Sequence, residues 1–217
     1  MKLIFEQIRV GGDRNFGYLV ADRNAGLGVI VDPSYSPESL VNRAQVQGLT
    51  ITHVVNTHGH PDHTNGNDRA VELTGAAVAA HPESPVQPSV ELADGAELEI
   101  GSLKLKCLEM PGHCPDHVIL YEPTYQFLIT GDLLFVGKVG GAQSDHDARV
   151  EWRSLQRVLS MFREETTVWP GHDYGVRPSS TIGLEKQTNP FLTCDDVDAF
   201  LKLRAEWPAF KKQHGLK

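Results

Sequence analysis

Residues 58–63 read His58-Gly59-His60-Pro61-Asp62-His63, which places three imidazoles and one carboxylate within six positions. An apolar run from Ile51 to Val55 leads directly into this cluster and is predicted to form a strand. Gly59 and Pro61 are expected to break regular structure beyond it, so that the ligands lie on a loop. Although His-rich tracts also occur as solvated loops, this density of ligand groups after a strand indicates a site for a pair of divalent metal ions.

Three later stretches share one pattern, in which a short apolar strand is followed by a turn containing glycine and then by a His or an Asp. They are Met110-Pro111-Gly112-His113, Phe127-Leu128-Ile129-Thr130-Gly131-Asp132 and Val168-Trp169-Pro170-Gly171-His172. Each alone is a weak signal, because a lone His after a strand is more often an ordinary surface or satisfied buried group. Three in the same context predict that they complete the coordination of the metal ions.

Together these motifs closely resemble the metallo-β-lactamase superfamily, and within it the branch that contains glyoxalase II and the persulfide dioxygenases. Two further family-like features are Val31-Asp32-Pro33, whose aspartate usually supports the metal loop, and Pro170-Gly171-His172-Asp173-Tyr174. The resemblance runs from about residue 1 to about residue 192, in the family's order. It implies an α/β fold, the αββα sandwich, and alternating strand and helix patterns are consistent with a layered α/β domain.

The resemblance also implies the ligand set. It assigns His58, His60 and His113 to one metal and Asp62, His63 and His172 to the other, with Asp132 bridging the two. Imidazoles suit zinc or iron, and the carboxylates offset the positive charge. We therefore expect two divalent ions per chain, zinc first, with iron or manganese as alternatives. A water held between such ions loses a proton near neutral pH, and Asp62 is expected to orient this nucleophile as the catalytic carboxylate.

Composition narrows the class of protein. With 217 residues, of which 40% are hydrophobic, the chain can bury one sizeable core. We predict a single domain over residues 1–217 with a short helical tail over about 179–217. The formal net charge of -8 argues against a nucleic-acid partner, and no apolar stretch is long enough to span a membrane. Glu6 stands where a signal peptide would continue its apolar region, which predicts a cytoplasmic protein.

The cysteines also favour a reducing compartment, because there are three of them and none forms a C-x-x-C pair. Cys114 directly follows the predicted ligand His113. We interpret it as a small residue that packs under the loop, where relatives often have Thr, in preference to a redox or substrate role.

Periodicity places the elements around these motifs. Strands are predicted over Leu3–Val10, Phe16–Ala21 and Gly28–Val31, and helices over Ser36–Gln47, Asn67–Leu73 and Ala148–Phe162. In the tail, a capped helix is expected within residues 179–190, stopped by Pro190, and a second helix over Asp195–Glu206.

The tail and the segment after Asp132 bear on substrate. The tail is much shorter than the helical substrate-binding domain of full-length glyoxalase II. It looks more like the tails of compact glyoxalase II-like hydrolases and persulfide dioxygenases. Glyoxalase II places a basic residue nine positions after its bridging Asp to hold glutathione, and here that position is Gly141. Tyr174 matches a substrate-facing tyrosine of these relatives, while a packing role is equally compatible with the sequence.

Three hypotheses follow. The favoured one is a metal-dependent hydrolase acting on a small thioester or thiol-derived substrate such as an acyl-glutathione, with another ester or a lactone as a variant. The second is a mononuclear iron persulfide dioxygenase, whose iron is held at positions like His58, His113 and Asp132. Against it, Gly140-Gly141-Ala142-Gln143 lacks the Arg that is typical of those enzymes. A structural metal site is disfavoured because such sites are closed and usually rich in Cys. A homo-oligomer is compatible with all three.

Overall fold

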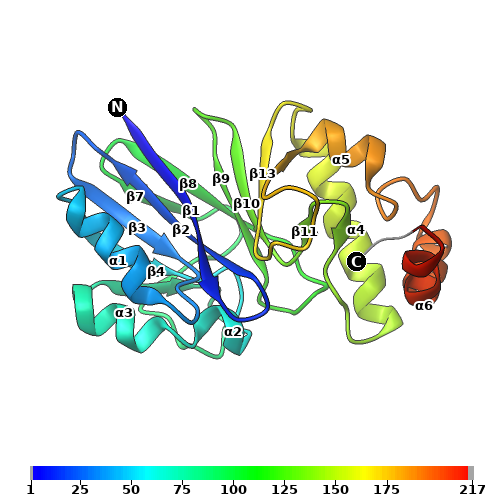
Figure 1. The fold of residues 1–217 in the computed structure, drawn as a ribbon, viewed down its shortest axis with the longest axis horizontal. Helices are drawn as coiled ribbons and strands as arrows, with labels where there is room; N and C mark the ends of the chain where they lie inside the picture. The colour runs from blue at the N-terminus through cyan, green and yellow to red at the C-terminus, as the bar shows by residue number, and fades with distance from the viewer. Residues whose placement is uncertain (1, 215–217) are drawn as a thin grey trace.

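The computed structural model describes residues 2–214 as four layers, with two sheets face to face and helices on both outer sides (Figure 1). The first sheet has the order β1-β2-β3-β4-β5-β6. Its pairs are antiparallel from β1 to β3 and parallel from β3 to β6. Its strands are β1 (Leu3–Gly11), β2 (Asn15–Asp22), β3 (Leu27–Val31), β4 (Thr50–Val55), β5 (Ala77–Ala80) and β6 (Val90–Glu91).

The second sheet has the order β14-β13-β10-β9-β8-β7, and a separate two-stranded hairpin joins β11 to β12. Within the sheet only β10 and β13 pair in parallel. Its strands are β7 (Glu97–Ile100), β8 (Leu103–Glu109), β9 (Val118–Glu122), β10 (Phe127–Gly131), β13 (Thr167–Pro170) and β14 (Ser180–Thr181). The hairpin consists of β11 (Leu134–Phe135) and β12 (Lys138–Val139).

The main core lies between the two sheets, where Tyr18 and Val31 of the first sheet belong to the same buried cluster as Leu105 and Leu120 of the second. Strand β8 alternates buried and exposed residues along most of its length, as a strand with one face on the core must. Strand β2 is buried along its whole length, because its other face is covered by helix α1. Burial on both faces explains its near-continuous apolar sequence.

Each sheet is covered on its outer face by helices. The helices are α1 (Pro37–Val46), α2 (Pro61–Thr64), α3 (Asn67–Thr74), α4 (Asp145–Met161), α5 (Ile182–Thr188) and α6 (Val197–His214). Leu40 of α1 and Ala70 of α3 share a buried cluster with the first sheet. Leu155 of α4, Ile182 of α5 and Phe200 of α6 share another with the second sheet. This arrangement confirms the predicted α/β fold of the αββα type.

Two expectations about the elements were wrong. Pro61 does not interrupt regular structure but is the first residue of the short helix α2, a position where its missing N–H costs no hydrogen bond. The last helix starts later and runs further than Asp195–Glu206. It starts later because Asp196 Oδ1 accepts the N–H groups of Asp198 and Ala199 at 3.0 and 2.8 Å and so caps it. Beyond Glu206, the Trp207 ring packs on Phe191 at 4.6 Å, and the helix continues through Pro208.

Within residues 2–214 there is no helix with both the length and the apolar character that crossing a bilayer requires.

Candidate metal centre

The predicted ligands lie on segments that follow four strands of the two sheets, and two of them, Asp62 and His63, are on the short helix α2. The stretch His58–His63 follows β4 of the first sheet, and His113 follows β8 of the second. Asp132 follows β10 and His172 follows β13. Because β10 and β13 run in parallel, with Gly131 paired to Pro170, their carboxyl ends deliver these last two side chains to the same place.

All seven predicted ligand residues come together in the structure. They form three overlapping groups in which the ligand atoms lie within 4.8 Å of one another. These groups are His58 with His60 and His113, His58 with His63 and Asp132, and Asp62 with His63 and His172. The first and third are the two sets predicted from the sequence, and Asp132 lies between them, where a bridging carboxylate is expected.

The imidazole rings point one nitrogen each toward the centre of the cluster. His60 Nδ1 lies 3.1 Å from His58 Nε2 and 3.0 Å from His113 Nε2. On the other side, His63 Nε2 lies 3.2 Å from His172 Nε2. Nitrogens bound tetrahedrally to one zinc ion at its usual bond length lie about 3.3 Å apart. The spacing and the His and Asp donor set therefore fit divalent metal ions.

The outward nitrogens of four rings are anchored by fixed oxygens. His58 Nδ1 lies 3.1 Å from Thr57 Oγ1, and His63 Nδ1 lies 3.0 Å from Asp32 Oδ2. His113 Nδ1 lies 2.6 Å from the Gly141 carbonyl oxygen, and His172 Nδ1 lies 2.9 Å from the Asp13 carbonyl oxygen. Carbonyl and carboxylate oxygens can only accept, and the Thr57 hydroxyl gives its own proton to Asp32 Oδ2, so each of these contacts places the ring proton outward. The inward nitrogen keeps its lone pair for a metal, which is how proteins orient ligating imidazoles.

Asp32 supports the metal loop at both ends. Its Oδ1 accepts the Thr57 N–H at 2.9 Å, and its Oδ2 accepts the Thr57 hydroxyl at 2.7 Å as well as contacting His63. Asp32 is fully buried and has a φ of 47°, a left-handed conformation that aspartate tolerates better than most residues. The carboxylate that the family resemblance singled out thus fixes the residue just before the cluster and the last residue of the cluster.

The rings fall into two groups according to whether their surroundings lower or raise the pKa. Burial lowers the pKa of His58 well below its usual value and lowers that of His113 as well. Burial also opposes protonation of His63, but Asp132 and Asp32 outweigh it and raise the pKa of His63 well above its usual value. For His172, burial is likewise outweighed by the hydrogen bond to Asp132, which raises its pKa.

The two carboxylates of the cluster lie in different surroundings. Asp132 is buried, and its Oδ1 has no hydrogen-bond partner among the described residues. A buried carboxylate oxygen without a donor is costly, and a bound cation would satisfy it. Asp62 is half-buried, and its Oδ2 lies 3.4 Å from His172 Nε2 and 3.6 Å from His63 Nε2.

Two buried residues next to these carboxylates were not identified from the sequence. Asn15 of β2 donates from Nδ2 to Asp62 Oδ2 at 3.0 Å, and so holds the predicted catalytic carboxylate. His117 accepts the backbone N–H of Asp132 on Nε2 at 3.0 Å, and burial lowers its pKa to about 3, so the ring is neutral. His117 follows His113 by four residues, a spacing that could have singled it out. Asn15 carries no such signal, because its role depends on β2 lying beside the loop.

The two remaining sequence candidates lie at the margin of the cluster. Cys114 is buried, and burial raises the pKa of its thiol, which therefore stays protonated, as expected for a packing residue. The Tyr174 ring stacks on His172 with centroids 4.7 Å apart and planes 4° apart. Its hydroxyl donates to Asp13 Oδ2 at 2.7 Å.

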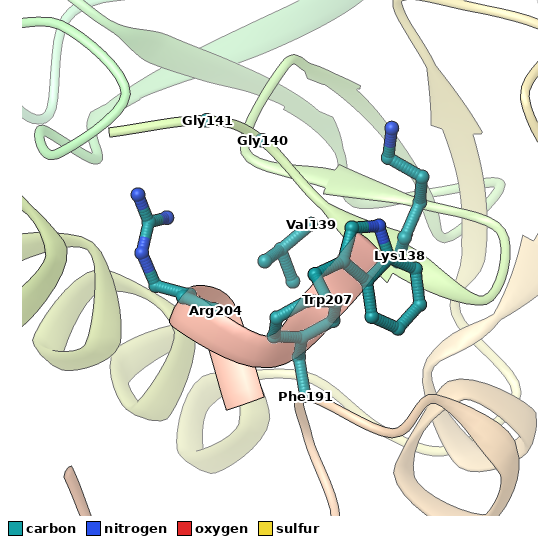
Figure 2. Close-up of a pocket in the computed structure, with 7 residues that line it drawn as sticks. All are labelled: Lys138, Val139, Gly140, Gly141, Phe191, Arg204 and Trp207. Atoms are coloured by element: carbon teal, nitrogen blue, oxygen red, sulfur yellow. The ribbon is translucent and has the colours of Figure 1, made fainter. Parts of the chain in front are cut away.

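Two cavities meet at Lys138 and Trp207 beside the cluster. The larger one, of about 630 Å³, is also lined by Arg14, Tyr174 and Arg177. The smaller one, of about 180 Å³, is shown in Figure 2, where Arg204 and Lys138 lie on opposite sides of Trp207. Its remaining lining residues are Val139, Gly140, Gly141 and Phe191.

Known proteins resemble the chain in sequence along nearly its whole length. The model of the metallo-beta-lactamase superfamily matches residues 10–172. A hydroxyacylglutathione hydrolase of Polaromonas sp. (strain JS666) is 35% identical over 244 residues, covering 95% of this chain and 92% of the relative. A hydroxyacylglutathione hydrolase of Nitrosococcus oceani is 29% identical and covers 90% of this chain and 87% of the relative.

Solved structures resemble it in fold. ETHE1 from Myxococcus xanthus superposes with a TM-score of 0.84 at 30% identity, covering 94% of this chain and 91% of that chain. TTHA1623, crystallised in a di-iron-bound form, superposes with a TM-score of 0.72 at 32% identity, covering 86% of this chain and 100% of that chain. The resemblance predicted from the motifs is confirmed. The chain belongs to the metallo-beta-lactamase superfamily and is a metallohydrolase of that family.

Proposed function

We propose that this metallohydrolase cleaves a small thioester with a pair of divalent ions, zinc first, held by the seven His and Asp residues of the cluster. The observation that carries the proposal is the convergence of these ligand atoms in groups within 4.8 Å, with four ring protons anchored outward. When bound, such ions lower the pKa of a water molecule and polarise a carbonyl. The site needs no Ser or Cys nucleophile for this chemistry.

Asp62 is our candidate for the catalytic carboxylate. It is the less buried of the two carboxylates, so it can contact both the cluster and an incoming water. Asn15 donates to its Oδ2, and the Ser34 hydroxyl donates to its backbone carbonyl at 2.5 Å. A carboxylate fixed in this way can accept a hydrogen bond from the attacking water and aim it, which is the usual requirement for such a group.

The thioester is supported by the relatives and by the cavity beside the cluster. Two of the relatives are named for the hydrolysis of hydroxyacylglutathione. The cavity of about 630 Å³ is of the size that small-molecule sites have, and the half-buried Tyr174 would form the wall nearest His172. The ammonium of Lys138 lies 4.2 Å over the Tyr174 ring and has no carboxylate partner among the described residues. Its pKa is lowered, first by burial and then by Lys211.

An unpaired, partly desolvated cation suits an anionic group on the substrate. Tyr174 contacts both His172 and Lys138. We propose that this group lies on the thiol carrier, several bonds from the scissile carbonyl. Gly141, where glyoxalase II has a basic residue, contributes no side chain. Lys138, three positions earlier, offers the positive charge that we propose in its place.

Replacing Lys138 with Met should raise the Michaelis constant about tenfold for a thioester whose thiol bears a carboxylate, with little change in kcat. The reason is the loss of one charge-assisted contact with the substrate. Such a contact contributes about 1.4 kcal/mol to binding, and this free energy corresponds to a tenfold change in affinity. The measurement is steady-state hydrolysis of a glutathione thioester and of the neutral N-acetylcysteamine thioester with the same acyl group. Lys202→Met, which removes an exposed charge outside both cavities, is the control. An equal effect of Lys138→Met on both substrates would contradict the assignment.

The experiment that tests the function combines metal content with turnover. Protein expressed with zinc and iron available should retain two metals per chain and hydrolyse thioesters. No hydrolysis across a panel of thioesters, other esters and lactones would overturn the proposal. One iron per chain together with oxygen uptake on glutathione persulfide would favour the dioxygenase, which the ETHE1 neighbour keeps in consideration. The cytoplasmic location, the single-domain organisation and the lack of a nucleic-acid partner stay predictions from the sequence.

A further inference from the structure

Arg204 of α6 links the C-terminal tail to two segments next to His113. It reaches the backbone at Gly112 through Glu151, and it binds the loop at Ala142 directly. Its Nη1 donates to Glu151 Oε2 of α4 at 3.0 Å, and its Nη2 donates to the Ala142 carbonyl at 2.9 Å. Glu151 is fully buried, and the Arg204 side chain is 19% exposed. A single guanidinium therefore spans from a buried helix position to the loop that follows the β11–β12 hairpin.

The first of these segments is the backbone just before His113. Gly112 rests directly on α4, where a Cβ added at this glycine would lie 2.3 Å from the Glu151 Cα. Its φ of 135° also favours glycine. The start of the His113 loop is thus fixed by the position of Glu151, the residue that Arg204 holds.

The second segment is the loop that carries Gly140, Gly141 and Ala142. The Gly141 carbonyl accepts the Nδ1 proton of His113 at 2.6 Å, and the next carbonyl along the chain is the one that Arg204 binds. On the other side, a Cβ at Gly140 would lie 1.9 Å from the Asp132 carbonyl oxygen, so the loop is pressed against that residue. Figure 2 shows Arg204 beside this loop, with its guanidinium toward Gly141.

We propose that Arg204 is a positioning residue for His113, because it holds in place both the helix on which the His113 loop rests and, through the Ala142 carbonyl, the loop whose Gly141 carbonyl orients the His113 ring. Outer partners of this kind set the direction and the tautomer of a ligating imidazole. The planar fork of arginine can satisfy two acceptors at once, whereas the ammonium of lysine is a single point charge. The tail thereby takes part in metal binding, although it contributes no ligand itself.

This inference rests on the metal-binding part of the proposed function and not on the substrate. His113 is a ligand in the two-metal hydrolase and also in the mononuclear alternative. Metal affinity can be measured without turnover. A failure of thioester hydrolysis would therefore leave this inference standing, and a failure of the inference would leave the hydrolase standing.

The test is a zinc competition titration against a chromophoric chelator, with the unfolding midpoint of the metal-free protein measured in parallel. Arg204→Met alone leaves the buried carboxyl of Glu151 without its donor, which is destabilising in itself. The informative protein is therefore the double variant Glu151→Gln with Arg204→Met, which removes that carboxyl as well. Arg149→Met is the matched control, because Arg149 pairs α4 with α6 through Asp198 at 2.9 Å and contacts neither segment.

We expect the double variant to bind the zinc ion at His113 about tenfold more weakly, the low end of the cost of losing a direct outer partner of a ligand, because Arg204 acts on His113 through neighbouring residues. Arg149→Met should keep the wild-type zinc affinity. Arg204→Lys should lose less zinc affinity than the double variant, since its ammonium can still bind one of the two acceptors. Wild-type zinc affinity in the double variant would overturn the proposal. So would an equal loss of affinity in Arg149→Met, because the effect would then come from general loosening of α6.

Discussion

Asp132→Ala should leave a protein that folds but no longer retains its metal ions or hydrolyses substrate. Asp132 lies between the two His groups, within 3.2 Å of His172 Nε2 and 3.4 Å of His63 Nε2. It is the only carboxylate in the group that it forms with His58 and His63, so its loss removes the negative charge that would offset a divalent ion there. The loss of metal affinity should exceed the roughly 10 to 100-fold that an outer partner costs.

Metal content by elemental analysis, together with the rate of thioester hydrolysis, measures this effect. Glu99→Ala is a suitable control, because Glu99 is an exposed carboxylate of the edge strand β7 and pairs with Lys104. Both quantities should stay at the wild-type level in the control. Wild-type turnover in Asp132→Ala would refute the bridging assignment.

Acidification should release the two metal ions in two steps. The pKa values of His63 and His172 are raised by their carboxylate neighbours, so protons bind these rings at higher pH. Burial lowers the pKa values of His58 and His113, so protons bind these rings only at lower pH. Because only the neutral ring binds a metal, the ion held with Asp62 should leave first as the pH falls, and the other ion should follow.

Metals per chain after dialysis at stepped pH would show this order as a plateau near one. Single-site variants assign the steps. His113→Ala weakens the site that contains His58, so the ion held with Asp62 remains. This ion should be released at a higher pH than the ion that remains in His172→Ala, which is held at the site of His58 and His113. Release of both ions in one step, or the reverse order of the variants, would contradict the expectation.

The fold and the convergence of the candidate ligands could be predicted from the family that the motifs resemble, because each motif is local in the chain. Each ligand follows a strand that is visible as an apolar run, and the His58–His63 stretch carries four ligands without any tertiary information. Helix ends were less predictable. Pro61 at the start of α2 and Pro208 within α6 show that a proline marks a boundary only in some positions of a helix.

The residues that support the ligands could not be predicted, because sequence separation hides their contacts. Asn15 lies 47 residues before the carboxylate that it holds. Arg204 lies 62 residues after the carbonyl that it binds. Lys138 carries no signal in the sequence, because its place in the cavity walls depends on α6 lying beside the β11–β12 hairpin.

The ligands come from both sheets, and this has a thermodynamic consequence. The His58–His63 stretch follows a strand of the first sheet, whereas the candidate ligands His113, Asp132 and His172 each follow a strand of the second. Ions bound among them would act as cross-links that tie the two halves of the sandwich together. A ligand that binds only the folded chain adds stability in proportion to the logarithm of its free concentration. The melting temperature of this protein should therefore report the free metal concentration around it.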